Sequence, residues 1–186
     1  MRILFLLPFI AILFVSQNAN GQKVISGVTF FSDMYLGGEK LTINGGGLRE
    51  KYFFDLYVAA LYIKTKTKDA STIINNDEPM GITIKLVSNS VTREKFIESV
   101  NTGFKNASHG KATKDEISKF TGAFIYEFKK GDIINFKYTK DNGVLIEKNS
   151  YKLITIPGLE FKKALFSIWL GKIPADETLK SGMLGN

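Results

Sequence analysis

The pattern of apolar and polar residues divides the chain into a short apolar beginning and a longer mixed remainder. A basic start precedes an unbroken apolar run of 13 residues over 3–15, and the small residues Ala19 and Gly21 follow. This arrangement is typical of a secretion signal. The run is shorter than the roughly 20 residues that a membrane-spanning helix needs. The sequence therefore predicts a signal peptide over 1–21 and an exported domain over 22–186, either periplasmic or secreted.

Several stretches of the predicted domain have strand character. The stretch 81–88 alternates, so that its apolar side chains fall on one face. The stretch 52–63 is the most apolar, with Asp55 as its only charge, which is typical of a central strand buried on both faces. Further strands are expected at 24–25, 28–31, 41–44, 133–138, 144–147 and 151–156.

Apolar residues at helical spacing predict a pair of helices between the strands and one helix after them. Thr92 can cap the first of the pair, and Thr113 with Glu116 forms a capping box for the second. A long helix is expected over 159–170, and Pro174 is expected to open a short final turn of helix. Strands, a helical pair, strands and a helix predict an α+β domain in which helices cover an antiparallel sheet.

Composition and charge narrow the possible functions. The chain has no Cys and only one His, His109, so we expect no disulfide, no metal site and no triad of Ser-His-Asp type. No cofactor is predicted. The 25 basic residues exceed the 18 acidic ones, but they are spread along the chain, which does not favour a nucleic-acid partner. Weak attraction to anionic membrane surfaces stays open.

Polar residues near the most apolar stretch are the candidates for chemistry. The glycines at 45–47 precede a strand rather than a helix, so we expect a bulge or a close backbone approach instead of a phosphate-binding loop. Counting by two along one strand puts Arg49, Asp55 and Tyr57 on one face. Residue types favour an internal Arg49–Asp55 pair or a solvated Arg49. The other interpretation is an Arg held for the carboxylate of a ligand.

Three segments resemble the chalcone isomerase-like family, most closely its exported bacterial branch. They are 45–63, 91–96 and 164–180, and the resemblance extends over nearly the whole predicted domain. It implies an open-faced β-sandwich, in which a large antiparallel sheet and a layer of helices form a cleft. It also implies one of two functions: ring closure of a chalcone by an intramolecular lyase, or fatty-acid binding without known catalysis.

The residues that the family's enzymes use are only partly present. The resemblance places the enzymes' Arg at Arg49, their catalytic Thr at Tyr57 and their catalytic Tyr at Phe96. It places their Asn at Gly103 and their Lys near Val87. Ring closure develops negative charge on an enolate oxygen, and losing one aimed donor typically costs about 10²–10³ in rate. Phe96 and Val87 cannot donate, which favours a non-catalytic member.

The fatty-acid-binding relatives fit better. Their carboxylate is held by an Arg and a Tyr, which the resemblance places at Arg49 and Tyr57. Aromatic residues such as Phe96 and Trp169 are expected to line the apolar part of the site. On one continuous strand, roughly 26 Å would separate Arg49 from Tyr57. The two can share a carboxylate only if the chain turns or bulges between them.

The leading hypothesis is an exported, non-catalytic domain that binds a small amphipathic carboxylate such as a fatty acid. The first alternative is an isomerase of chalcone isomerase type that acts on an unknown substrate through Tyr57 and Arg49. The second alternative is a purely structural or partner-binding domain, whose own side chains would fill the cleft.

Overall fold

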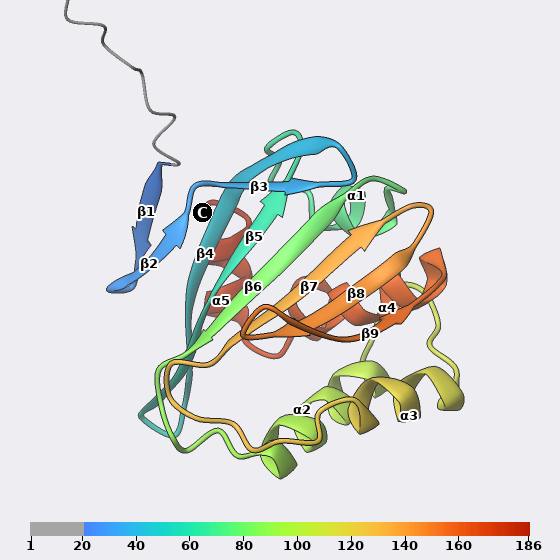
Figure 1. The fold of residues 1–186 in the computed structure, drawn as a ribbon. Helices are drawn as coiled ribbons and strands as arrows, with labels where there is room; N and C mark the ends of the chain where they lie inside the picture. The colour runs from blue at the N-terminus through green and yellow to red at the C-terminus, as the bar shows by residue number, and fades with distance from the viewer. Residues whose placement is uncertain (1–20) are drawn as a thin grey trace, which may run out of the picture.

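A computed structural model describes residues 21–186, and its centre is a curled antiparallel sheet of seven strands (Figure 1). The strands lie in chain order, so every neighbouring pair is joined by a direct reversal or a longer excursion of the chain. The predicted signal peptide over 1–21 lies outside the described residues, apart from Gly21. The strands of this sheet are β3 (Asp33–Leu36), β4 (Glu39–Lys51), β5 (Phe54–Ile63), β6 (Met80–Leu86), β7 (Ile133–Thr139), β8 (Gly143–Lys148) and β9 (Tyr151–Ile156).

Helices cover one face of this sheet and a small ribbon of two strands covers part of the other. In Figure 1, α4 and α5 lie behind the sheet and the pair α2 and α3 lies below it. The chain thus has the predicted α+β architecture. The ribbon is β1 (Gln22–Ile25) with β2 (Val28–Phe31), and the helices are α1 (Ala70–Asn75), α2 (Arg93–Lys105), α3 (Lys114–Gly122), α4 (Leu159–Leu170) and α5 (Glu177–Met183).

Strand β5 is buried on both faces, as its composition predicted. Tyr57 and Leu61 belong to the large core under the helices, whereas Val58 and Tyr62 belong to a smaller core under the ribbon. The alternation of strand side chains produces this division. The helix-facing core continues through edge-on ring contacts, because the ring of Phe120 in α3 lies 5.8 Å from that of Phe104 in α2 at an interplanar angle of 86°.

The stretch predicted as one strand over 52–63 begins with a chain reversal, so that prediction was wrong at its start. Tyr52 and Phe53 form a two-residue turn with φ of 52° and 67°, and β5 starts only at Phe54. Such turns usually contain Asn or Gly, because a bulky residue in this region costs on the order of 1–3 kcal/mol. Two aromatic residues give no turn signal. The short strand expected at 41–44 is correspondingly part of the longer β4.

The glycines at 45–47 lie inside β4, where a bulge interrupts the pairing with β5. A Cβ on Gly45 would lie 2.1 Å from the carbonyl oxygen of Gly182 in α5. A Cβ on Gly46 would lie 2.4 Å from the carbonyl oxygen of Ala59. The expectation of a bulge with close backbone approach is therefore confirmed, and it seats α5 directly on β4.

The helix ends follow their predicted capping residues, with one exception. Thr92 accepts a hydrogen bond from the Lys95 amide, and Thr113 with Glu116 forms the full capping box. The last helix, by contrast, does not begin at Pro174. Helix α5 begins three residues later, because the Asp176 side chain accepts from the Leu179 amide and caps it.

Candidate ligand-binding site

The β4–β5 hairpin brings Arg49 and Tyr57 together. The two are cross-strand partners, and the Arg49 Nη1 atom lies 3.4 Å from the Tyr57 Oη atom. The guanidinium carbon also lies 5.5 Å from the centroid of the Tyr57 ring. The turn at Tyr52 and Phe53 thus removes the separation of roughly 26 Å that one continuous strand would impose.

The expected pairing of Arg49 with Asp55 is wrong. Asp55 is exposed and lies opposite Glu50 in the hairpin, one register position away from the Arg49–Tyr57 pair. Between residues 21 and 186, no carboxylate forms an ion pair with Arg49. The reversal of the chain places the two side chains on different strands, so counting by two along one strand did not apply.

Ser99 of α2 is the second partner of Arg49, and the sequence alone did not point to it. Its Oγ atom lies 3.2 Å from both Nη1 and Nη2 of the guanidinium. Ser99 follows the buried Phe96 by three residues, so the helical period places both on one side of α2. That spacing is the only sequence signal that could have found it.

Trp169 does not line the cavity beside these groups, contrary to the expectation. It is 2% exposed on α4, and its indole Nε1 donates to the Tyr57 Oη atom over 2.9 Å. The Tyr57 oxygen therefore accepts from Trp169 and from Arg49. Because both contacts use its lone pairs, its own proton is free for an acceptor elsewhere.

The cavity has a volume of about 660 Å³, within the size range of small-molecule sites. It lies between the β4–β5 hairpin, helix α2 and the segment 173–175. Arg49, Tyr57 and Ser99 form one hydrogen-bonded group in its wall. Apolar side chains make up much of the remaining wall, including Leu56, Val91, Phe96 and Ile173.

Phe96 lines the cavity and is held by two other rings. It packs edge-on against Phe124 and Phe128, with ring centroids 5.1 Å and 4.9 Å away. This packing fixes an apolar ring at the position where the resemblance places the enzymes' catalytic Tyr. The wall is therefore apolar at this point.

The positions at which the resemblance placed the enzymes' Asn and Lys carry no donor into the cavity. A Cβ on Gly103 would lie 2.7 Å from the Ile168 Cγ2 atom, so α2 can pack on α4 only without a side chain there. Val87 packs against the smaller core on the opposite face of the sheet. An Asn at position 103 would require the two helices to separate.

The charges around the cavity are mostly positive. Arg49, Lys51 and Lys95 line it together with one acid, Glu98. In the described part of the chain, no group of three His, Cys, Asp or Glu residues is arranged to hold a metal ion. His109 lies elsewhere, within hydrogen-bond distance of two serine hydroxyls.

The most strongly shifted pKa values belong to groups outside this cavity. Burial lowers the pKa of Lys162 from 10.5 to about 8 and raises the pKa of Tyr62 from 10.0 to about 12. Burial, and a hydrogen bond to Asp77, also raise the pKa of Tyr138. None of these three groups lines the cavity. Strongly shifted pKa values often mark acid–base catalysts, and here they mark packed polar groups instead.

The curled sheet with its layer of helices defines an open-faced β-sandwich, and the site lies beside the turn of the β4–β5 hairpin. A model of the chalcone isomerase-like family matches residues 22–185. The chain therefore belongs to the chalcone isomerase-like family.

A solved structure with the same fold is a fatty-acid binding protein of Arabidopsis thaliana. Its TM-score with this chain is 0.69 at 16% sequence identity, and the match covers 88% of this chain and 96% of that one. At this identity the likeness establishes the fold. No curated protein matches the sequence. Among residues 21–186, no helix has the length and apolar character needed to cross a membrane.

Proposed function

We propose that this domain binds an amphipathic carboxylate, such as a fatty acid, without catalysing its conversion. The observation that carries the proposal is the set of donors at Arg49 and Tyr57. They line a cavity, and no carboxylate within residues 21–186 forms an ion pair with the guanidinium. Family membership supports the proposal, as does the fold shared with a plant protein described as fatty-acid binding.

Counting donors and acceptors favours an anion as the ligand. A guanidinium has five N–H donors and no acceptor, and the acceptors found for Arg49 are the two neutral oxygens of Ser99 and Tyr57. The hydroxyl hydrogen of Tyr57 is a further donor beside the guanidinium. A carboxylate offers two oxygens that accept several such bonds, and its planar shape suits the guanidinium fork.

The apolar wall would accommodate the rest of the ligand. Leu56 and Phe96 lie on the cavity wall beyond the polar group, and burying an alkyl chain against them is favourable by about 0.8 kcal/mol per CH₂. The lyase alternative has less support. Phe96 has no hydroxyl, and the packing at Gly103 excludes a side chain.

We also propose that the domain acts outside the cytoplasm, as a member of an exported bacterial branch of the family. The apolar leader over 3–15 and the small residues that follow it support export. Export would bring the domain into contact with membrane lipids, which are a source of amphipathic carboxylates.

The test compares a charged ligand with a neutral one of equal chain length. Delipidated wild-type protein is titrated with palmitate and with hexadecanol by calorimetry, and the same is done for Arg49→Ala. Because a hydrogen bond to a charged group contributes about 1.5–3 kcal/mol, palmitate affinity should fall about 10- to 100-fold while hexadecanol affinity changes little. Lys68→Ala, which removes an exposed positive charge, is the matched control.

Two results would contradict the proposal. One is a delipidated protein that takes up no fatty acid at all. The other is an Arg49→Ala variant that binds palmitate as the wild type does. Turnover of a chalcone, abolished by Tyr57→Phe, would instead favour the lyase alternative.

A further inference from the structure

We propose that the tip of the β4–β5 hairpin docks the domain on an anionic lipid surface, with the cavity mouth against the membrane. The docking itself stands on the exposed side chains at this tip and on the charges beside them. That a ligand passes from the bilayer into the cavity rests on the proposed function.

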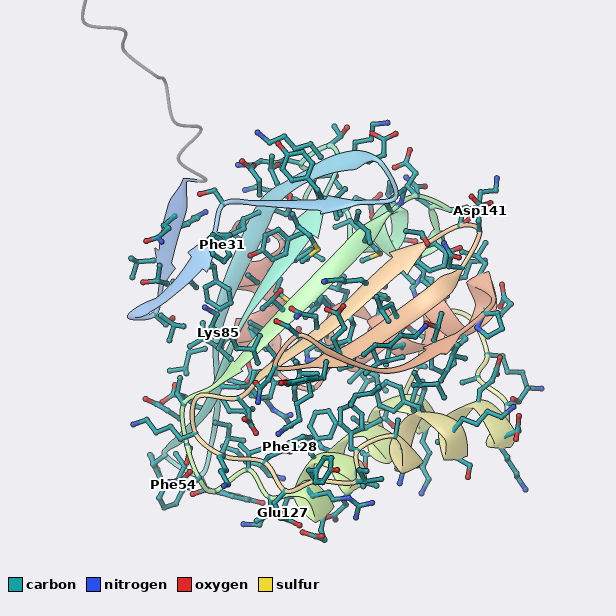
Figure 2. The ribbon with its side chains drawn as sticks, viewed as in Figure 1. Phe31, Phe54, Lys85, Glu127, Phe128 and Asp141 are labelled. Carbon is teal, nitrogen blue, oxygen red and sulfur yellow. The ribbon has the colours of Figure 1, made fainter. Side chains whose placement is uncertain are left out.

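The hairpin tip presents three consecutive aromatic side chains to solvent. Tyr52 is 80% exposed, Phe53 is fully exposed and Phe54 is 61% exposed. Figure 2 shows Phe54 at the lower left extremity of the molecule, far from Phe31 of β2. Exposed apolar side chains that lie together are typical of interaction sites.

Two of these three side chains line the cavity. Tyr52 and Phe54 line it from the hairpin, and Ile173, which is 61% exposed, lines it from the segment after α4. Phe53 at the apex is not part of the lining. A surface that covered the tip would therefore also cover the opening between the hairpin and Ile173.

The backbone of the tip is strained at Tyr52 and Phe53. Tyr52 and Phe53 both adopt left-handed φ values, which Asn-Gly would adopt with little strain. Bulky residues held in such a conformation often occur at functional sites. The aromatic side chains thus lie where turn geometry disfavours them and where the folded domain does not bury them.

Charges near the rim differ between the two sides of the hairpin. Lys51 and Lys95 line the cavity side, and the Lys51 Nζ atom lies 5.4 Å from the centroid of the Tyr52 ring. The acids Glu50 and Asp55 occupy opposite register positions on the two strands, and neither lines this cavity. Glu98 is the one acid that lines the cavity.

A lipid surface fits this combination of aromatic rings and lysines. Tyr and Phe side chains partition into the boundary between headgroups and acyl chains, and Lys residues beside them attract anionic headgroups. The net charge of +7 draws the whole chain towards such a surface. The aromatic rings and the lysines therefore both favour an anionic lipid surface as the partner.

The first experiment measures insertion at the tip. Phe53→Trp is mixed with vesicles of equal parts phosphatidylcholine and phosphatidylglycerol whose acyl chains carry bromine, which quenches nearby indoles. We expect strong quenching of the new Trp on these vesicles and little on pure phosphatidylcholine. Tyr35→Trp on β3, at a position that is 70% exposed, is the control, and the buried Trp169 supplies the same background in both variants.

The second experiment measures affinity. In co-sedimentation with the same anionic vesicles, Phe53→Ser should bind at least about 10-fold more weakly than wild type. Tyr151→Ser, which removes a 78% exposed ring from β9, should bind as wild type does. Equal quenching of the two Trp variants, or equal sedimentation of the two Ser variants, would overturn the proposal. So would wild-type self-association that Phe53→Ser abolishes without any vesicle binding, because a second copy would then cover the tip.

Palmitate binding in vesicle-free buffer separates this proposal from the previous one. Phe53→Ser should bind palmitate normally there, because Phe53 does not line the cavity. If palmitate binding is absent but vesicle docking is intact, the proposed function fails and the docking surface stands. If palmitate binding is intact but vesicle docking is absent, the proposed function stands and the docking surface fails.

Discussion

Two cations, the half-buried Arg49 and the fully buried Lys162, are in opposite chemical situations. Lys162 is fully buried on α4, and its ammonium donates to the carbonyl oxygens of Ile73, Ile74 and Asn76 over 3.0, 2.8 and 2.7 Å. An ammonium has three donors, so every one is used. The accepting carbonyls lie at the end of α1, where helix geometry leaves carbonyls without intrahelical partners.

The guanidinium of Arg49 has five N–H donors but only two protein oxygens accept from it in the described residues. Its guanidinium contacts the neutral oxygens of Ser99 and Tyr57 and lies beside a cavity of about 660 Å³. The comparison teaches that burial alone does not mark a functional cation. A buried cation whose donors are all satisfied holds the fold, whereas one with spare donors beside a cavity is a candidate for ligand binding.

The largest expected effect tests whether Lys162 stabilises the fold. Lys162→Met preserves most of the side-chain volume but leaves three carbonyls without a donor, each of which costs about 1–3 kcal/mol when buried. We expect a loss of about 4 kcal/mol and a fall in Tm of about 8–16 °C, measured by calorimetry. Palmitate affinity at 15 °C should be unchanged. A variant with wild-type Tm would show that Lys162 does not hold α1.

The pH dependence of the free energy of unfolding is a second test of the burial of Lys162. The unfolded chain keeps the Lys162 proton up to a pKa near 10.5, whereas the folded chain releases it at about 8. Between these values the unfolded state binds more protons, so the free energy of unfolding rises with pH. Urea unfolding of wild type should gain up to about 3 kcal/mol between pH 8 and 10.5, relative to Lys162→Met. A constant difference between the two proteins across that range would refute this assignment.

The smallest expected effect tests how Arg49 is positioned. Ser99→Ala removes one neutral acceptor of the guanidinium, and such a bond contributes about 1 kcal/mol. Palmitate affinity should fall about 5-fold, with little change in Tm. Ser118→Ala on the exposed surface of α3 is the matched control, because it makes the same substitution in a helix. Unchanged affinity in Ser99→Ala would mean that the hairpin alone orients Arg49.

Local patterns predicted most of the fold. The strand at 151–156 and the helix at 159–170 begin and end where the sequence indicated, and the capping box at Thr113 formed as expected. These features depend on hydrophobic period and on side chains a few residues away. Such short-range causes can be read along the chain.

The site was less predictable. Arg49, Tyr57 and Phe96 were predicted from the sequence and all line the cavity, whereas Trp169 proved to lie behind Tyr57. Ser99 was missed, because its spacing of three residues from Phe96 is a weak signal and does not identify Arg49 as its partner. These relations join residues far apart in sequence.

The sequence by itself determined the α+β class, the helix caps, the excess of positive charge and the absence of cysteine chemistry. Each of these depends on composition or on near neighbours. Only the tertiary structure decided that two aromatic residues form a turn and that Arg49 lies opposite Tyr57. It also decided that all three donors of Lys162 bind carbonyl oxygens at the end of α1, whereas Arg49 keeps donors for a ligand. The physical reason is that a cation's role depends on how many acceptors surround it. Those acceptors come from segments that meet only when the chain folds.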